Sequence, residues 1–283
     1  MRPPIRPNVS LPPARHRLLL LLALAAACRG EEGGAGTGGG GRDGKGGGTT
    51  DSADGGIAIV TRTAYTPAPL AQMGGIEGVV RLDGAAPADS THQVGRDSAR
   101  CGARVVERAV QQQGGGLGEA VVWLDDVRSG KPHPELRRIE LSHERCQYAP
   151  RVQVTSAPST LNVLNDDRAV HVTTVTHVGA SKPVVSIPFT DDGQVVPTEL
   201  AARTSGVVEV RCAQHPWATA YIASFDHPYY ALTSTDGRFR LDSVPPGRYT
   251  IKVWHPRGRQ VVSQPVQVGA GGAVTVEAGM AVK

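Results

Sequence analysis

Short segments rich in valine, isoleucine and threonine recur along the chain from residue 76 onward, and turn residues separate them. The segments in the first part of this region are 76–82, 119–124, 138–141, 152–155, 160–164, 171–178 and 183–187. No long apolar pattern with a period of 3.6 residues follows the amino-terminal segment. Short strands at regular intervals predict an all-β fold, a β-sandwich.

The clearest alternation lies at residues 207–212. Val208, Val210 and Cys212 share one face of this strand, and Glu209 and Arg211 share the other. The period of two therefore points the Cys212 thiol inward at the end of the strand. His215 follows three residues later and precedes Pro216, which biases His215 toward an extended backbone.

A thiolate and an imidazole on a short, stiff loop form a pair of metal ligands. The upstream partner is His171, which follows Asn165 and Asp167. Two imidazoles and one thiolate in a trigonal plane, with a weak axial ligand, make a blue-copper electron-transfer site. His171, Cys212 and His215 are therefore the candidate ligands of one copper ion.

At these residues the chain resembles the cupredoxins, in particular the plastocyanin- and amicyanin-like proteins. Asn165, Asp167 and His171 match an Asn-x-Asp-x-x-x-His stretch, and the other match is Cys-x-x-His-Pro in Cys212 to Pro216. Ala218 stands where the family has its axial methionine. The resemblance implies a Greek-key β-sandwich over residues 75–226, with redox partners such as c-type cytochromes.

The last part of the chain has a separate pattern. Thr235-Asp236-Gly237-x-Phe239 and Pro245-Pro246-Gly247-x-Tyr249 each combine a turn with an aromatic residue in a strand. They resemble the carboxypeptidase regulatory-like domain, a small transthyretin-like β-sandwich, which we expect over residues 227–283. A segment of this length is marginal for an independent core. We therefore expect it to pack on the first domain, with Ile76 to Leu82 contributing a strand.

The amino-terminal 28 residues have the pattern of a secretory signal. Arginines precede ten apolar residues, Leu18 to Ala27, too few to span a bilayer, and Cys28 follows. Leu24 to Cys28 resembles a bacterial lipobox, in which Cys28 is lipidated; the alternative is an ordinary cleaved signal. The glycine-rich residues 29–74 predict a disordered linker. We expect an extracytoplasmic lipoprotein anchored to a membrane, in the periplasm or at the cell surface.

Charge and motifs exclude two classes of function. Four arginines in the amino-terminal segment account for the net charge of +4, which leaves 26 basic and 26 acidic residues. A neutral chain has no electrostatic footprint for nucleic acid. The sequence also lacks the serine-nucleophile elbow, the phosphate-binding and dinucleotide-binding glycine motifs and the zinc-protease motif. We expect a protein that is not an enzyme.

The remaining cysteines are Cys101 and Cys146. A disulfide between them would close a loop of about 45 residues, worth roughly 4 kcal/mol in the chain-entropy model. One alternative is two free buried thiols. The other is a zinc site built from His143, Cys146, Cys212 and His215.

The expected function is a membrane-tethered copper protein that carries single electrons, with the edge of one imidazole as the exit. The alternative is a non-catalytic binding module with a carbohydrate-binding-like fold, whose surface contacts glycan or an envelope protein. Tyr229 and Tyr230 would supply its sugar-stacking face, although they also suit an interdomain core.

Overall fold

The computed structural model describes residues 64–69, 71–135, 137–198 and 206–283. Almost all regular structure there is β-strand, which confirms the all-β fold class. Cys28, the signal segment and most of the expected linker lie outside the described residues. Within the described ranges, no helix has the length and apolar character needed to cross a bilayer.

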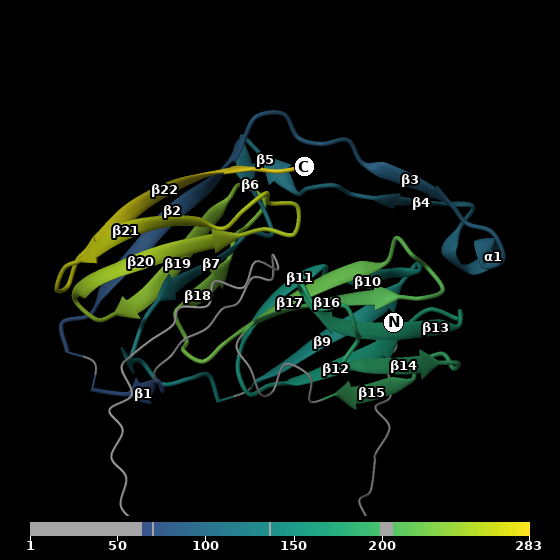
Figure 1. The fold of residues 1–283 in the computed structure, drawn as a ribbon, viewed down its shortest axis with the longest axis horizontal. Coiled ribbons are helices and arrows are strands. Elements are labelled where there is room, and N and C mark those ends of the chain that lie inside the picture. Colours follow the sequence, from purple (N-terminus) through teal and green to yellow (C-terminus); the bar gives the residue numbers. More distant parts are fainter. Residues whose placement is uncertain (1–63, 70, 136, 199–205) are drawn as a thin grey trace, which may run out of the picture. The chain divides into compact units, whose positions relative to one another are not determined.

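The first sandwich contains two sheets in the orders β10-β9-β12-β15 and β11-β17-β16-β13-β14 (Figure 1). Its strands are β9 (Arg138–Glu144), β10 (Gln147–Ala149), β11 (Val152–Ser156), β12 (Thr160–Asn165), β13 (His171–His177), β14 (Val185–Phe189), β15 (Val195–Thr198), β16 (Gly206–Cys212) and β17 (Thr219–Phe225). Leu141, Leu161 and Ile222 are among the fully buried residues of its core. The inward face of β16 carries Val208, Val210 and Cys212, as the alternation predicts.

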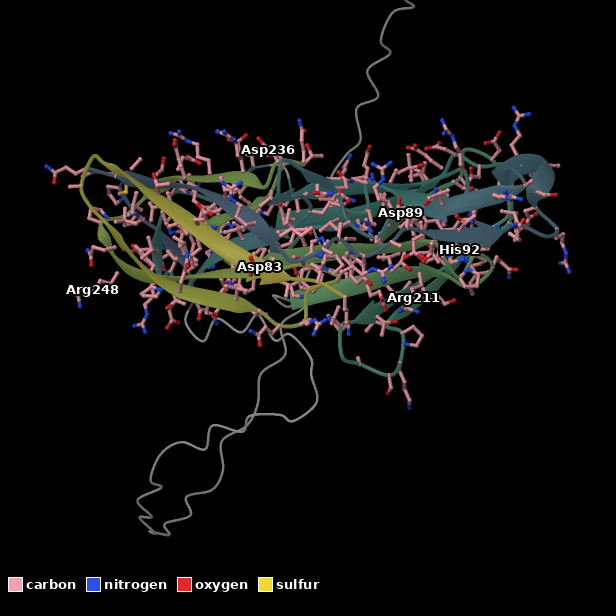
Figure 2. All side chains as sticks on the ribbon, turned by 90° about the horizontal axis from the view of Figure 1, so that it is seen from above. Asp83, Asp89, His92, Arg211, Asp236 and Arg248 are labelled. Carbon is pink, nitrogen blue, oxygen red and sulfur yellow. A yellow bond between two sulfur atoms is a disulfide. The ribbon has the colours of Figure 1, made fainter. Side chains whose placement is uncertain are left out.

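The second sandwich has the sheet orders β18-β7-β20-β21 and β19-β2-β6-β5, with β22 paired to β2. Its strands are β2 (Gly74–Asp83), β5 (Gln112–Gln113), β6 (Gly116–Leu117), β7 (Val121–Asp125), β18 (Tyr230–Leu232), β19 (Arg238–Val244), β20 (Gly247–Trp254), β21 (Val262–Val268) and β22 (Ala273–Ala281). Ile76, Leu124 and Ile251 lie fully buried in its core. Charged side chains such as those of Asp83 and Arg248 are exposed on its strands (Figure 2).

The strand pairing differs from the expected boundary at residue 226. β2 pairs in parallel with β22 over nine residues, from Gly75–Ala273 to Asp83–Ala281, and antiparallel with β19. The contribution of Ile76 to Leu82 to the second sandwich is therefore observed. β7, which we expected in the first sandwich, pairs with β18 and β20. The second sandwich is thus built from two separated parts of the chain.

A third apolar cluster joins strands of both sandwiches. It contains Trp123 of β7, Trp254 of β20 and Phe225 of β17. The ring of Tyr230 stacks on Phe225, with 4.9 Å between ring centroids, and Tyr229 is fully buried. Tyr229 therefore belongs to the core and offers no sugar-stacking face, and the partly buried Tyr230 packs one ring face on Phe225.

The remaining elements are short. β3 (Ser90–Gln93) and β4 (Arg104–Glu107) form an antiparallel pair, and α1 (Ser98–Cys101) lies between them. β1 (Thr66–Pro67) pairs with β8 (Ser129–Gly130). The segment from β3 to β4, residues 90–107, is called the cap below because it covers part of the candidate site.

Candidate metal centre

The three candidate ligands come from two neighbouring strands and the loop after one of them. His171 begins β13 and Cys212 ends β16, and these antiparallel strands pair Thr173 with Cys212. His215 lies in the loop between β16 and β17. This loop is closed by hydrogen bonds from the Cys212 N–H to the Ala218 carbonyl (3.1 Å) and from the Ala218 N–H to the His215 carbonyl (2.8 Å).

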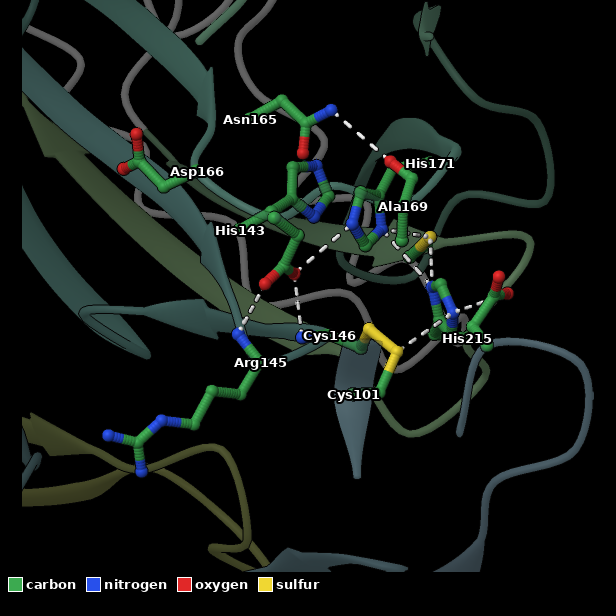
Figure 3. A network of polar contacts seen from close by, with 12 residues as sticks. Cys101, His143, Arg145, Cys146, Asn165, Asp166, Ala169, His171 and His215 are labelled. Carbon is green, nitrogen blue, oxygen red and sulfur yellow. Dashed lines mark hydrogen bonds and ion pairs between the residues drawn. A yellow bond between two sulfur atoms is a disulfide. The ribbon is translucent and has the colours of Figure 1, made fainter. Parts of the chain in front are cut away.

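The ligand atoms converge on one small buried volume (Figure 3). The Cys212 Sγ lies 3.5 Å from Nδ1 of His171 and 3.6 Å from Nδ1 of His215. The two Nδ1 atoms are 3.1 Å apart. Metal bonds of about 2.0–2.3 Å, as found for nitrogen and sulfur ligands, give ligand separations of roughly 3.1–3.8 Å around one ion. The three residues therefore fit a single metal ion in a trigonal arrangement.

Each imidazole has a carboxylate at its other nitrogen. Nε2 of His171 lies 3.2 Å from Asp167, and Nε2 of His215 lies 3.3 Å from Asp97 of the cap. Asp167 also accepts hydrogen bonds from the backbone N–H groups of Arg145 and Cys146, both at 2.6 Å. Carboxylates in this position orient the ring and direct Nδ1 toward a metal.

The electrostatics of the metal-free site favour a thiolate beside an imidazolium. Burial alone would raise the pKa of Cys212, but hydrogen bonds from His171 and His215 outweigh it and lower the pKa to about 6. Burial would lower the pKa of His171, but Asp167 and Cys212 raise it to about 9. Cys212 is thus largely ionised near neutral pH, in the form that binds metal.

A third histidine lies against the site. The ring of His143 stacks on His171 with 3.9 Å between centroids and an 18° interplanar angle. Its Nε2 lies 2.9 Å from Oγ1 of Thr173, which also accepts a hydrogen bond from the hydroxyl of Tyr148. His143 therefore supports the His171 ring through stacking, which the sequence did not indicate.

The expected disulfide is present between Cys101 and Cys146. It removes the alternative of two free thiols. It also removes the zinc alternative, because Cys146 has no thiolate to offer beside Cys212 and His215.

Neither ligand imidazole has an edge at the surface, where we expected the exit for electrons. The side chain of His171 is fully buried and that of His215 is 2% exposed. Asp97 and Cys101 of the cap, together with Trp217, cover the outer side of His215. Trp217 in turn stacks on His92 of β3, with ring centroids 5.4 Å apart.

Neither methionine in the described part of the chain replaces the missing axial ligand. Ala218 is buried, Met280 lies in the core of the second sandwich, and Met73 immediately precedes β2. Gln214 is exposed in the ligand loop. The site therefore has three candidate protein ligands, His171, Cys212 and His215. The apolar Ala218 occupies the sequence position where the family pattern has methionine.

Comparison with known protein families finds one match, in the last part of the chain. Residues 204–281 match the carboxypeptidase regulatory-like domain. This match includes β16 and β17, which belong to the first sandwich. It therefore begins before the strands of the second sandwich. Comparison with curated protein sequences finds no match.

Solved structures similar to the chain include cupredoxins. A novel purple cupredoxin from Nitrosopumilus maritimus is 18% identical with a TM-score of 0.26, and the similarity covers 30% of this chain and 97% of the cupredoxin. Amicyanin from Paracoccus versutus is 16% identical with a TM-score of 0.26, covering 32% and 83%. A copper-containing nitrite reductase from Thermus scotoductus is 18% identical with a TM-score of 0.27, covering 35% of this chain and 24% of the reductase.

Proposed function

We propose that the protein is a copper-binding electron carrier and not an enzyme. The observation that carries this proposal is the convergence of one thiolate and two Nδ1 atoms, 3.1–3.6 Å apart, in a buried volume. When copper is bound by this ligand set, it supplies a one-electron redox couple. The chain's own residues hold the geometry and exclude water from it.

His171, Cys212 and His215 would hold copper as three protein ligands, and Ala218 offers no donor atom. Ala218 is fully buried, and it belongs to the same apolar core cluster as the fully buried Phe189 and Ala220. Burial in apolar surroundings keeps water from taking the axial position. The thiolate and the two imidazoles then set the spectrum, because the axial ligand chiefly tunes the potential.

The partners that we propose are redox proteins such as c-type cytochromes. Because the cap covers His215, an electron would pass through the residues that overlie it, and Trp217 with His92 is the aromatic pair that leads outward. We further propose that Cys28 anchors the protein to a membrane outside the cytoplasm. A glycan- or envelope-binding module remains the alternative function, without a stacking face at the buried Tyr229.

The decisive experiment is a visible absorption spectrum of residues 64–283 after addition of Cu(II). We expect an intense thiolate-to-copper band with one copper retained after dialysis, and its loss in Cys212→Ser. A chain that folds normally but stays colourless and retains no copper would contradict the proposal and leave the binding module as the better account.

A further inference from the structure

The disulfide lies against the outer nitrogen of a copper ligand. The Cys101 Sγ is 3.8 Å from Nε2 of His215. The ligand atoms of Cys101, Cys146 and His215 all lie within 4.8 Å of one another, and all three residues are buried (Figure 3). One imidazole therefore faces Cys212 through Nδ1 and the disulfide through Nε2. Nε2 also lies 3.3 Å from Asp97, so a metal bound at Nε2 would displace that carboxylate.

Both cysteines are held in place by contacts other than the S–S bond. The N–H of Cys101, at the end of α1, donates to the Asp97 carbonyl at 2.8 Å. The N–H of Cys146, in the turn between β9 and β10, donates to Asp167 at 2.6 Å. The carbonyl of Cys146 accepts a hydrogen bond from Nε1 of Trp217 at 2.8 Å. These bonds would keep the two sulfur atoms beside His215 after the disulfide opens.

We propose that reduction of the disulfide creates a second metal site, in which the thiolates of Cys101 and Cys146 and Nε2 of His215 bind Cu(I). Soft thiolate ligands select Cu(I) among the metals available to such a site. The Cα atoms of the two cysteines are 5.4 Å apart, close enough for both sulfur atoms to reach one ion. This site lies on the cap side of His215, opposite Cys212.

The redox step needs a dithiol as reductant. The dithiol gives two electrons to the S–S bond, which breaks, and becomes a disulfide itself, so that Cys101 and Cys146 leave as thiols. Each thiol then loses its proton as Cu(I) binds, because the thiolate is the ligand. Copper is not oxidised or reduced in this sequence.

The inference shares His215 with the proposed copper site, but it does not need Cys212. The test therefore uses the full chain with Cys28→Ser and Cys212→Ser, in which Cys101 and Cys146 are the remaining two of the chain's 4 cysteines. Thiol titration measures opening of the disulfide by a phosphine, and circular dichroism checks the fold. Cu(I) is then added without oxygen, in competition with a chromogenic Cu(I) chelator.

We expect the reduced chain to bind one Cu(I) and the oxidised chain to bind none against the chelator. Adding Cys101→Ser and Cys146→Ser should abolish binding. His215→Ala should weaken Cu(I) binding at least about tenfold, the smallest loss found when even an outer partner of a metal ligand is changed. His177→Ala should leave Cu(I) binding unchanged.

Three results would overturn the inference: a disulfide that resists reduction while the chain is folded, a chain that unfolds on reduction, or Cu(I) binding no tighter than in the variant without both cysteines. A failure of the proposed Cu(I) site can be distinguished from a failure of the copper site formed by His171, Cys212 and His215. The absorption band of the oxidised chain with Cys212 present reports on the first site alone.

Discussion

Each imidazole of the candidate copper site is oriented by a carboxylate, one near its histidine in the sequence and one far from it. Asp167 lies four residues before His171, but Asp97 lies in the cap, far from His215 in sequence. Because a ring held at Nε2 presents Nδ1 in a defined direction, these contacts prepare the site before metal arrives.

Asp167→Asn tests this orientation. The amide keeps one oxygen for the backbone N–H groups of Arg145 and Cys146 but loses the charge beside His171. We expect copper affinity to fall about 10–100-fold, as for other outer partners of metal ligands, measured by chelator competition. Asp192→Asn, which removes an exposed pair with Arg168, is the matched control. Equal affinities in the two variants would contradict the orienting role.

Ala218→Met tests the trigonal site. A thioether donor would stabilise Cu(II) more than Cu(I), because the more highly charged ion gains more from an added electron donor. We therefore expect the reduction potential to fall, as voltammetry would show, with the thiolate band retained. Ala218→Leu adds similar bulk without a donor and controls for overpacking, which costs about 1–3 kcal/mol in a packed core. A fall of the same size in both variants would argue against axial ligation.

At the scale of elements, the second sandwich depends on strands far from it in sequence. β2 lies between β22 and β19, and β7 lies between β18 and β20. Without them, the carboxy-terminal strands would lose their central partners and expose Ile251 and Leu241, which are now buried. Unpaired strand edges and exposed apolar faces prevent a stable sheet.

The fragment 227–283 should therefore not fold alone. We expect a disordered circular dichroism spectrum and no cooperative thermal transition, whereas residues 64–283 should show both a β spectrum and a transition. Supplying residues 74–125 on the same chain, joined by a flexible linker to residue 227, should restore strand content. A cooperative transition in the short fragment would show that β2 and β7 are dispensable.

At the scale of the whole molecule, burial disfavours the charged form of His143, His227 and His255 in the described part of the chain. Burial lowers the pKa of His143 to about 3, of His227 to about 4 and of His255 to about 3. Since an unfolded histidine titrates near 6.5, the unfolded chain takes up protons below that pH while the folded chain does not. Acid therefore favours unfolding through all three residues.

We expect the free energy of unfolding of the metal-free protein to fall steeply as the pH drops from 6.5 toward 4. Each residue contributes up to about 1.4 kcal/mol per pH unit to this slope, and the three together contribute roughly 4 kcal/mol per pH unit. Denaturant titrations at several pH values measure this slope. His255→Gln should reduce it by about a third; an unchanged slope would contradict the assignment.

Between pH 6.5 and 9 we expect little change in that free energy. The pKa of His171 is raised to about 9, so its contribution to the free energy of unfolding is fully present below pH 6.5 and is lost as the pH rises through 9. The lowered pKa of Cys212, about 6, makes its contribution present above 9 and lost as the pH falls through 6. The two contributions run in opposite directions over this range and offset each other. Cys212→Ser removes the Cys212 contribution and part of the rise in the pKa of His171, but Asp167 still raises that pKa, so stability should fall with rising pH.

The sequence alone determined the local features of this protein. The alternation at Val208, Val210 and Cys212 places a thiol inside a strand end, and the spacing to His215 puts an imidazole beside it, because both follow from backbone geometry over a few residues. His171 and the missing methionine at Ala218 came from a family pattern, and the pairing of Cys101 with Cys146 from the count of cysteines.

Only the tertiary structure decided which distant segments meet. No local pattern could place Asp97 and the disulfide on His215, stack His143 on His171, or assign β7 to the second sandwich. The turn at Gly237 is visible in the sequence, but its positive φ and its tight approach to the Val80 carbonyl belong to the pairing of β19 with β2. Strand formation is a local preference, whereas strand pairing is settled by burial of apolar faces across the whole chain, and so the cover over the copper site appears only in three dimensions.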